Sequence, residues 1–264
     1  MEIAISTATF FGKSYTEDSL DLIKSLGLKT VEVFLTTFRE YEPVFGDLLA
    51  SRKGDLNVHS VHSLNLHYEP ELFNNAERTR EDAEAILNKV MSNGAKLGAK
   101  YYTFHGIARL KKRPYVVDYD IFARKLERVM AVTARYGIEL SYENVHWALF
   151  NTPEFFMNLR SCCPGVKATL DIKQAMQAGL SYKEFLPAVK GRLSTVHICD
   201  YDRGGNLTCP GKGSVDFRDL FESLLDIGYD GPVMLELYSN NYENYSELAR
   251  SIEYLQKILY QINH

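Results

Sequence analysis

The 264-residue sequence predicts an α/β protein built as a single (β/α)8 TIM barrel over residues 1–264. Short apolar runs alternate with longer amphipathic stretches along the whole chain, as in parallel strands joined by helices. The length is close to the roughly 250 residues that such a barrel usually needs. No low-complexity segment or long charge run divides the sequence. These observations favour eight strands closed into one barrel.

Eight strands are expected from short runs rich in β-branched, aromatic and leucine residues. They are Ile3–Ser6, Thr30–Phe34, Val58–Ser63, Tyr101–His105, Glu139–Glu143, Lys167–Asp171, Ser194–Cys199 and Val233–Leu237. Amphipathic segments between and after them predict helices at Glu17–Leu26, Thr79–Leu97, Asp118–Tyr136, Phe217–Ile227 and Tyr245–Ile262. A further helix is expected to begin at Pro153, with Thr152 as its N-terminal cap.

Three helix-to-strand junctions share one pattern, in which a glycine follows the last residue of the helical segment. The glycines are Gly27, Gly98 and Gly137. Glycine is favoured at this place because it readily adopts the left-handed conformation that ends many helices. A doubly wound open sheet is the alternative fold, but it calls for a glycine-rich phosphate turn after an early strand. Residues 6–10, Ser-Thr-Ala-Thr-Phe, do not form such a turn.

Composition limits the cellular locations and the kinds of binding partner that we expect. The formal net charge is −4, which disfavours binding that depends on many contacts between basic side chains and phosphates. Residues 1–5 read as a strand and lack the features of a secretory signal, and no window approaches a membrane span of about 20 apolar residues. The four cysteines include no C-x-x-C pair. We therefore expect a cytoplasmic protein with reduced cysteines and no nucleic-acid or membrane partner.

Polar residues at the ends of the last four strands are the strongest functional signal. Active sites of such barrels lie at the C-terminal ends of the strands. The residues found there are Glu143, Asp171, His197 and Glu236. Without a cation, three close carboxylates would repel one another. Three carboxylates and one imidazole suit one divalent ion, with Mn²⁺ favoured and Mg²⁺, Co²⁺ or Zn²⁺ as alternatives.

The chain resembles the sugar phosphate isomerase/epimerase branch of the xylose isomerase-like barrel superfamily, which also holds ketose 3-epimerases, inosose-processing enzymes and class II AP endonucleases. The similarity is most specific at residues 142–144, 170–171, 197–200, 211–217 and 236. It implies that the metal ligands are Glu143, Asp171, His197 and Glu236. Among these, Glu143 and Glu236 would be the catalytic acid–base pair. It also implies that Arg203, six residues after His197, contacts the substrate.

The sequence also departs from this family. Many relatives have histidine three residues after the strand-6 aspartate, where this chain has Gln174. Glutamine can bind a substrate hydroxyl but cannot shuttle a proton. The endonuclease Asp-x-His motif is replaced by Gly205 and Leu207, which argues against a nuclease. His62 and His105 match positions that bind a further zinc in the endonucleases. We expect them to bind substrate here, with a second metal as the alternative.

The residues and the resemblance together predict a metal-dependent isomerase or epimerase. Its substrate would be a small sugar, a sugar phosphate or a polyol, and the proton would move through an enediolate. A dehydratase acting on an inosose-like substrate would use the same ligands and stays open. An endonuclease-like hydrolase and a non-catalytic sugar-binding barrel are weaker alternatives. The polar, aromatic segment Tyr238–Tyr245 could contact a second copy of the chain in a homo-oligomer.

Overall fold

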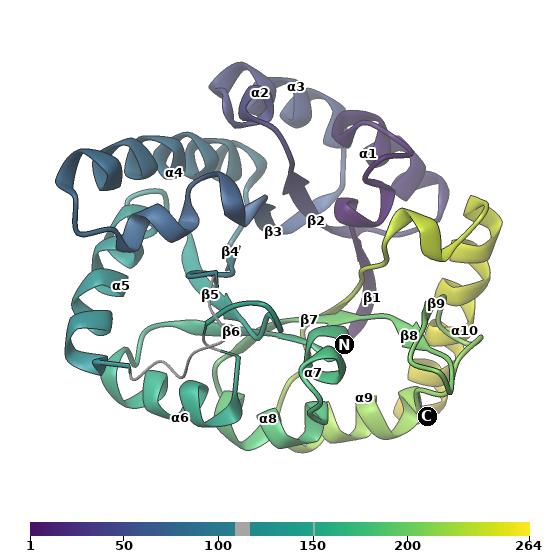
Figure 1. The fold of residues 1–264 in the computed structure, drawn as a ribbon. Coiled ribbons are helices and arrows are strands. Elements are labelled where there is room, and N and C mark those ends of the chain that lie inside the picture. The colour runs from purple at the N-terminus through teal and green to yellow at the C-terminus, as the bar shows by residue number, and fades with distance from the viewer. Residues whose placement is uncertain (109–116, 150) are drawn as a thin grey trace.

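The computed structural model describes residues 1–108, 117–149 and 151–264, and it confirms the predicted barrel. Eight parallel strands close in the order β1-β10-β7-β6-β5-β4-β3-β2. Figure 1 shows helices outside this ring of strands. The strands are β1 (Glu2–Ser6), β2 (Thr30–Leu35), β3 (Asn57–Ser63), β4 (Tyr101–Phe104), β5 (Glu139–Glu143), β6 (Lys167–Asp171), β7 (Leu193–Ile198) and β10 (Pro232–Leu235).

Helices follow the strands around the ring. They are α1 (Thr16–Ser25), α2 (Phe38–Tyr41), α3 (Pro43–Lys53), α4 (Glu77–Leu97), α5 (Tyr119–Ala134), α6 (Pro153–Cys162), α7 (Ile172–Gln177), α8 (Tyr182–Val189), α9 (Phe217–Asp226) and α10 (Tyr245–Asn263). Short 3-10 turns are η1 (Thr7–Phe10), η2 (Asn65–His67), η3 (Glu69–Phe73) and η4 (Ser239–Asn241). A small antiparallel hairpin, β8 (Asp200–Tyr201) and β9 (Leu207–Thr208), extends from β7. Within the described ranges, no helix is both long and apolar enough to cross a bilayer.

The structure adds helices that the hydrophobic pattern did not predict. In α3 only Gly46 and Leu49 are buried, so the helix has little apolar periodicity to detect. In α8 an internal proline, Pro187, interrupts a sequence of only eight residues. Three predicted strands are also too long at their C-terminal ends. β7 stops at Ile198, so Cys199 lies outside it. β4 stops at Phe104 and β10 stops at Leu235, so His105 and Glu236 begin the loops that follow.

Small hydroxyl side chains occupy part of the barrel interior. The Ser141 Oγ lies 2.6 Å from both the Thr169 Oγ1 and the Ser194 Oγ, and all three residues are buried. Ser60 and Thr103 instead donate hydrogen bonds to a buried carboxylate of β2. Alternate residues of a strand point to opposite faces, so these polar side chains face inward while the apolar neighbours pack against the helices. The interior can therefore hold charged groups beneath the mouth of the barrel.

The three predicted junction glycines have the expected backbone conformation. Their φ angles are 75° at Gly27, 78° at Gly98 and 71° at Gly137. At Gly98 the amide donates to the carbonyls of Gly94 and Ala95, which closes α4 before β4 begins. The glycine thereby turns the chain from the outer layer back into the sheet.

Replacing Gly98 with alanine should lower the free energy of unfolding by about 1–2 kcal/mol, because a Cβ is disfavoured in the left-handed region. Urea denaturation would measure the loss. Gly165→Ala is the matched control, since its Cβ would meet only the flexible end of Met130, 3.3 Å away, and its φ is not left-handed. Equal stability losses in the two variants would contradict this explanation of Gly98.

Candidate metal centre

Four side chains from adjacent strands converge at the C-terminal mouth of the barrel. Glu143 ends β5, Asp171 ends β6, His197 lies in β7, and Glu236 directly follows β10. Each offers one ligand atom, and these four atoms lie within 4.8 Å of one another. All four side chains are buried, and the His197 Nδ1 lies 3.3 Å from the Glu143 Oε1. The structure thus brings together the set of residues that the strand-end rule selected.

Unpartnered atoms within this group fit a bound cation. The His197 Nδ1 and the Asp171 Oδ2 are buried and make no hydrogen bond with the described residues. Most buried polar atoms in proteins do have a partner, so two such atoms in one cluster require an explanation. A divalent ion accepts a lone pair from both oxygen and imidazole nitrogen. The donor set therefore fits a metal such as Mn²⁺ or Zn²⁺.

Glu32 is a functional candidate that the sequence analysis missed. It lies in β2, is fully buried, and accepts hydrogen bonds from Ser6, Ser60 and Thr103 at 3.1, 2.8 and 2.7 Å. Its Oε1 also lies 3.2 Å from the His197 Nε2. A carboxylate accepts a hydrogen bond, so the Nε2 carries a hydrogen, and the Nδ1 is the ring atom left for a metal. Metal-binding histidines are commonly oriented by a carboxylate in this way.

The electrostatic surroundings of Glu32 keep it ionised. Burial alone would raise the pKa of its carboxyl group, since a low-dielectric interior disfavours the charge. The rings of His197 and His62 reverse that effect and hold the pKa of Glu32 well below its ordinary value. The His62 Nδ1 lies 3.4 Å from the Glu32 Oε1. The buried anion therefore accepts a hydrogen bond from His197 and lies close to His62 as well.

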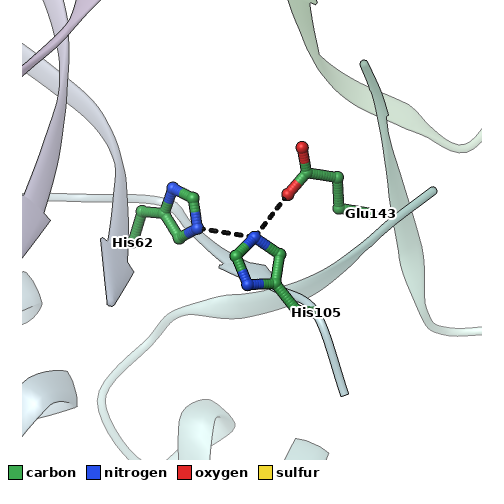
Figure 2. Close-up of side chains that lie close together, drawn as sticks. All are labelled: His62, His105 and Glu143. Atoms are coloured by element: carbon green, nitrogen blue, oxygen red, sulfur yellow. Dashed lines mark hydrogen bonds and ion pairs between the residues drawn. The ribbon is translucent and has the colours of Figure 1, made fainter. Parts of the chain in front are cut away.

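A second group, drawn in Figure 2, joins His62, His105 and Glu143. The two imidazole Nε2 atoms are 2.8 Å apart, and the His105 Nε2 lies 2.8 Å from the Glu143 Oε2. Burial would lower the pKa of His105, but the Glu143 carboxylate raises it above the ordinary value. The ligand atoms of this trio also lie within 4.8 Å of one another. The trio can hold a cation or hydrogen-bond a substrate oxygen, and it shares Glu143 with the first group.

His105 is fixed from behind by Glu69, a buried residue of η3. The Glu69 Oε2 accepts hydrogen bonds from the backbone amides of His105 and Gly106 at 2.9 and 3.0 Å. The Tyr102 hydroxyl donates to the other oxygen of the same carboxylate. No sequence pattern identifies Glu69, because the backbone groups that it binds at His105 and Gly106 lie 36 and 37 residues away. Its contacts hold the start of the loop after β4 in place.

Lys173 is a further residue that the sequence analysis missed at the mouth. It follows Asp171 by two residues, and only 3% of it is exposed. Its Nζ lies 2.8 Å from the Glu236 Oε2 and 3.4 Å from the Asp171 Oδ2. Burial would raise the pKa of Glu236, but the lysine and the His197 ring lower it. At Asp171 burial prevails over Lys173 and raises the pKa to about 6.

Two of the predicted substrate-binding residues, Gln174 and Arg203, are not part of either group of close ligand atoms. The Gln174 Oε1 accepts a hydrogen bond from the His146 backbone amide at 3.0 Å and lies 2.5 Å from the His146 Nδ1. Its carbonyl is thus directed at His146, which was not among the predicted site residues. Arg203 is exposed in the turn between β8 and β9, and it forms no ion pair with the residues that the structure describes.

The fold and the four converging ligands define a parallel β/α barrel with a candidate metal centre at its mouth. The chain belongs to the xylose isomerase-like TIM barrel family, whose model matches residues 20–258. An uncharacterized protein of Methanocaldococcus jannaschii, MJ1188, is 24% identical over 98% of this chain and 100% of its own. L-ribulose-5-phosphate 3-epimerase UlaE of Salmonella typhi is 32% identical, over only 33% of this chain and 28% of the epimerase.

Solved structures share the fold across almost the full length. A D-tagatose 3-epimerase-like protein superposes with a TM-score of 0.79 at 20% identity, covering 100% of this chain and 98% of its own. An IOLI protein with a bound zinc atom superposes with a TM-score of 0.75 at 17% identity, covering 99% and 98% of the two chains. At these identities the likeness establishes the barrel architecture.

Glu32→Gln should weaken metal binding about 10- to 100-fold, as is typical when the group that orients a ligand histidine is lost. Isothermal titration of the metal-free protein with Mn²⁺ would measure the dissociation constant. Glu139→Gln is the matched control, because Glu139 is an exposed residue at the start of β5. An unchanged dissociation constant in Glu32→Gln, with the fold verified by circular dichroism, would show that Glu32 does not position His197.

Proposed function

We propose that this protein is a divalent-metal-dependent isomerase or epimerase acting on a small sugar, a sugar phosphate or a polyol. The observation that carries the proposal is the convergence of three carboxylates and one imidazole at the barrel mouth. Membership of the xylose isomerase-like family supports it. Sugar 3-epimerases and a zinc-bound protein among the structural neighbours add further support. Mn²⁺ is our first choice, since three of the four ligands offer oxygen, and Mg²⁺, Co²⁺ or Zn²⁺ are alternatives.

Glu143 and Glu236 are the proposed acid–base pair. When bound, the metal supplies Lewis acidity that makes the carbon next to a substrate carbonyl more acidic. One carboxylate then takes the proton from that carbon to give an enediolate, and the other carboxylate returns a proton. Both groups have lowered pKa values, because nearby cations outweigh their burial. They are therefore ionised at neutral pH and able to accept a proton.

The remaining predicted residues have proposed roles in substrate binding. His62 and His105 lie beside Glu143 and would hydrogen-bond substrate oxygens at the mouth. Arg203 would contact the far end of the substrate from the turn between β8 and β9. Gln174 would act mainly by orienting His146, given the contact between the two side chains. We further propose a cytoplasmic enzyme without nucleic-acid or membrane partners, with residues 238–245 as the surface for a second copy.

The outcome of the reaction depends on where the proton returns. Return to the opposite face of the same carbon gives epimerisation, and return to the adjacent carbon gives isomerisation. Expulsion of a neighbouring hydroxyl gives dehydration, as expected of an enzyme for inosose-like substrates. The 3-epimerases among the structural neighbours favour epimerisation. A nuclease is disfavoured, because Gln174 faces His146 and because Gly205 and Leu207 carry no metal-binding group.

Glu143→Gln and Glu236→Gln should each abolish exchange of solvent deuterium into the substrate, because an amide cannot take or return the proton. The measurement is proton NMR of a panel of ketoses incubated with each variant in D₂O. Glu139→Gln again serves as the control with intact exchange. Full deuterium incorporation in both variants would exclude the assigned roles of the two carboxylates.

Removing metal should remove activity. We expect dialysis against a chelator to lower turnover by at least about tenfold, because the Lewis acid is lost. Mn²⁺ or Co²⁺ should then restore it. Metal content would be determined by mass spectrometry beside each assay. Undiminished turnover by protein shown to be free of metal would refute the proposed dependence.

A further inference from the structure

Lys173 forms an ion pair inside the candidate metal centre itself. The ammonium group is almost fully buried at the start of α7. Its 2.8 Å contact is with the Glu236 Oε2, and that same oxygen lies 3.7 Å from the unpartnered His197 Nδ1. The Asp171 Oδ2, 3.4 Å from the ammonium, is also unpartnered by hydrogen bonds among the described residues. Lys173 therefore adjoins the same atoms that are available to a metal.

A charge in this position has two opposing consequences. A buried ammonium is tolerated only where anions surround it, and here two ligand carboxylates do so. In the absence of a metal, the lysine also offsets the mutual repulsion of the buried carboxylates. Once a dication occupies the same group, however, the ammonium becomes a neighbouring like charge. It must then oppose the binding of the metal.

The outer side of Lys173 is covered rather than open to water. Its Nζ lies 4.8 Å from the centroid of the Tyr238 ring, in the loop that follows β10. An aromatic face attracts a cation and restrains its position. The ammonium thus lies close to two carboxylates and one aromatic ring. These contacts keep the positive charge of Lys173 beside the carboxylates of Asp171 and Glu236.

We propose that Lys173 is a positioning residue that serves as a built-in counter-cation: it keeps Asp171 and Glu236 assembled without metal and weakens metal binding. The inference rests on the proposed function, since it presumes that the four residues bind a divalent ion. It goes beyond that function by proposing that one side chain sets how tightly the metal is bound. A purely structural lysine would act in the opposite sense, because its loss would disorder the ligands and weaken binding.

The experiment titrates metal-free wild type, Lys173→Met and Lys173→Arg with Mn²⁺ by isothermal calorimetry and records the melting temperature of each before and after loading. Lys173→Met keeps an unbranched side chain that is one atom shorter and removes its charge, whereas Lys173→Arg keeps the charge. The matched control is Lys183→Met, which removes a surface lysine paired with Asp219 at 2.7 Å. Circular dichroism verifies the fold of every variant.

Lys173→Met should bind Mn²⁺ at least about tenfold more tightly than wild type, a difference of about 1.4 kcal/mol. Its metal-free form should melt at a lower temperature, and Mn²⁺ should raise that temperature more than it does in wild type. Lys173→Arg and Lys183→Met should keep the wild-type dissociation constant. If metal-free Lys173→Met fails to fold, the proposal requires that excess Mn²⁺ restore folding, and a failure to do so counts against it.

The results separate this inference from the proposed function. If wild type binds Mn²⁺ and Lys173→Met binds it equally or more weakly, the role of Lys173 is wrong while the metal centre stands. If neither protein binds Mn²⁺, both proposals are wrong. If only Lys173→Met binds, the counter-cation is supported and metal dependence of the native enzyme is refuted.

Discussion

The mouth of this barrel depends on compensation of buried negative charge. Glu143, Asp171 and Glu236 occupy one small volume, and Glu32 lies beneath them. Carboxylates so close together are stable as anions only beside positive or hydrogen-donating groups. Serine and threonine hydroxyls donate hydrogen bonds to Glu32, and imidazoles lie beside Glu143. Lys173 forms ion pairs with Asp171 and Glu236. These partners meet part of the requirement, and a bound dication would meet the rest.

Much of the fold and the main ligand group could be predicted from the sequence, because both follow local rules. Alternating apolar runs located the eight strands, and glycines such as Gly98 marked the ends of helices. The strand-end rule then selected Glu143 and His197 without knowledge of any contact. Their convergence is a consequence of barrel closure, since the last residues of neighbouring parallel strands lie at similar depth.

The residues that escaped prediction act through contacts between distant parts of the chain. Glu32 lies in the middle of an apolar strand, where a single acidic residue carries no signal until β7 brings His197 within 3.2 Å. Lys173 reads as an ordinary residue of a short helix, and only the coordinates show that its ammonium is buried. Gln174 departs from the family pattern in the sequence itself. Its partner, His146, lies in a loop whose path no local pattern determines.

The shared position of Glu143 limits how its role can be dissected. One oxygen of its carboxylate faces His197 and the other faces His105, so the side chain bridges the two groups. Any substitution there perturbs both groups simultaneously, and an inactive variant cannot reveal which of them matters. The flanking histidines do not have this ambiguity. Substituting His105 and His197 separately can therefore show whether Glu143 couples the group around His105 to the group around His197.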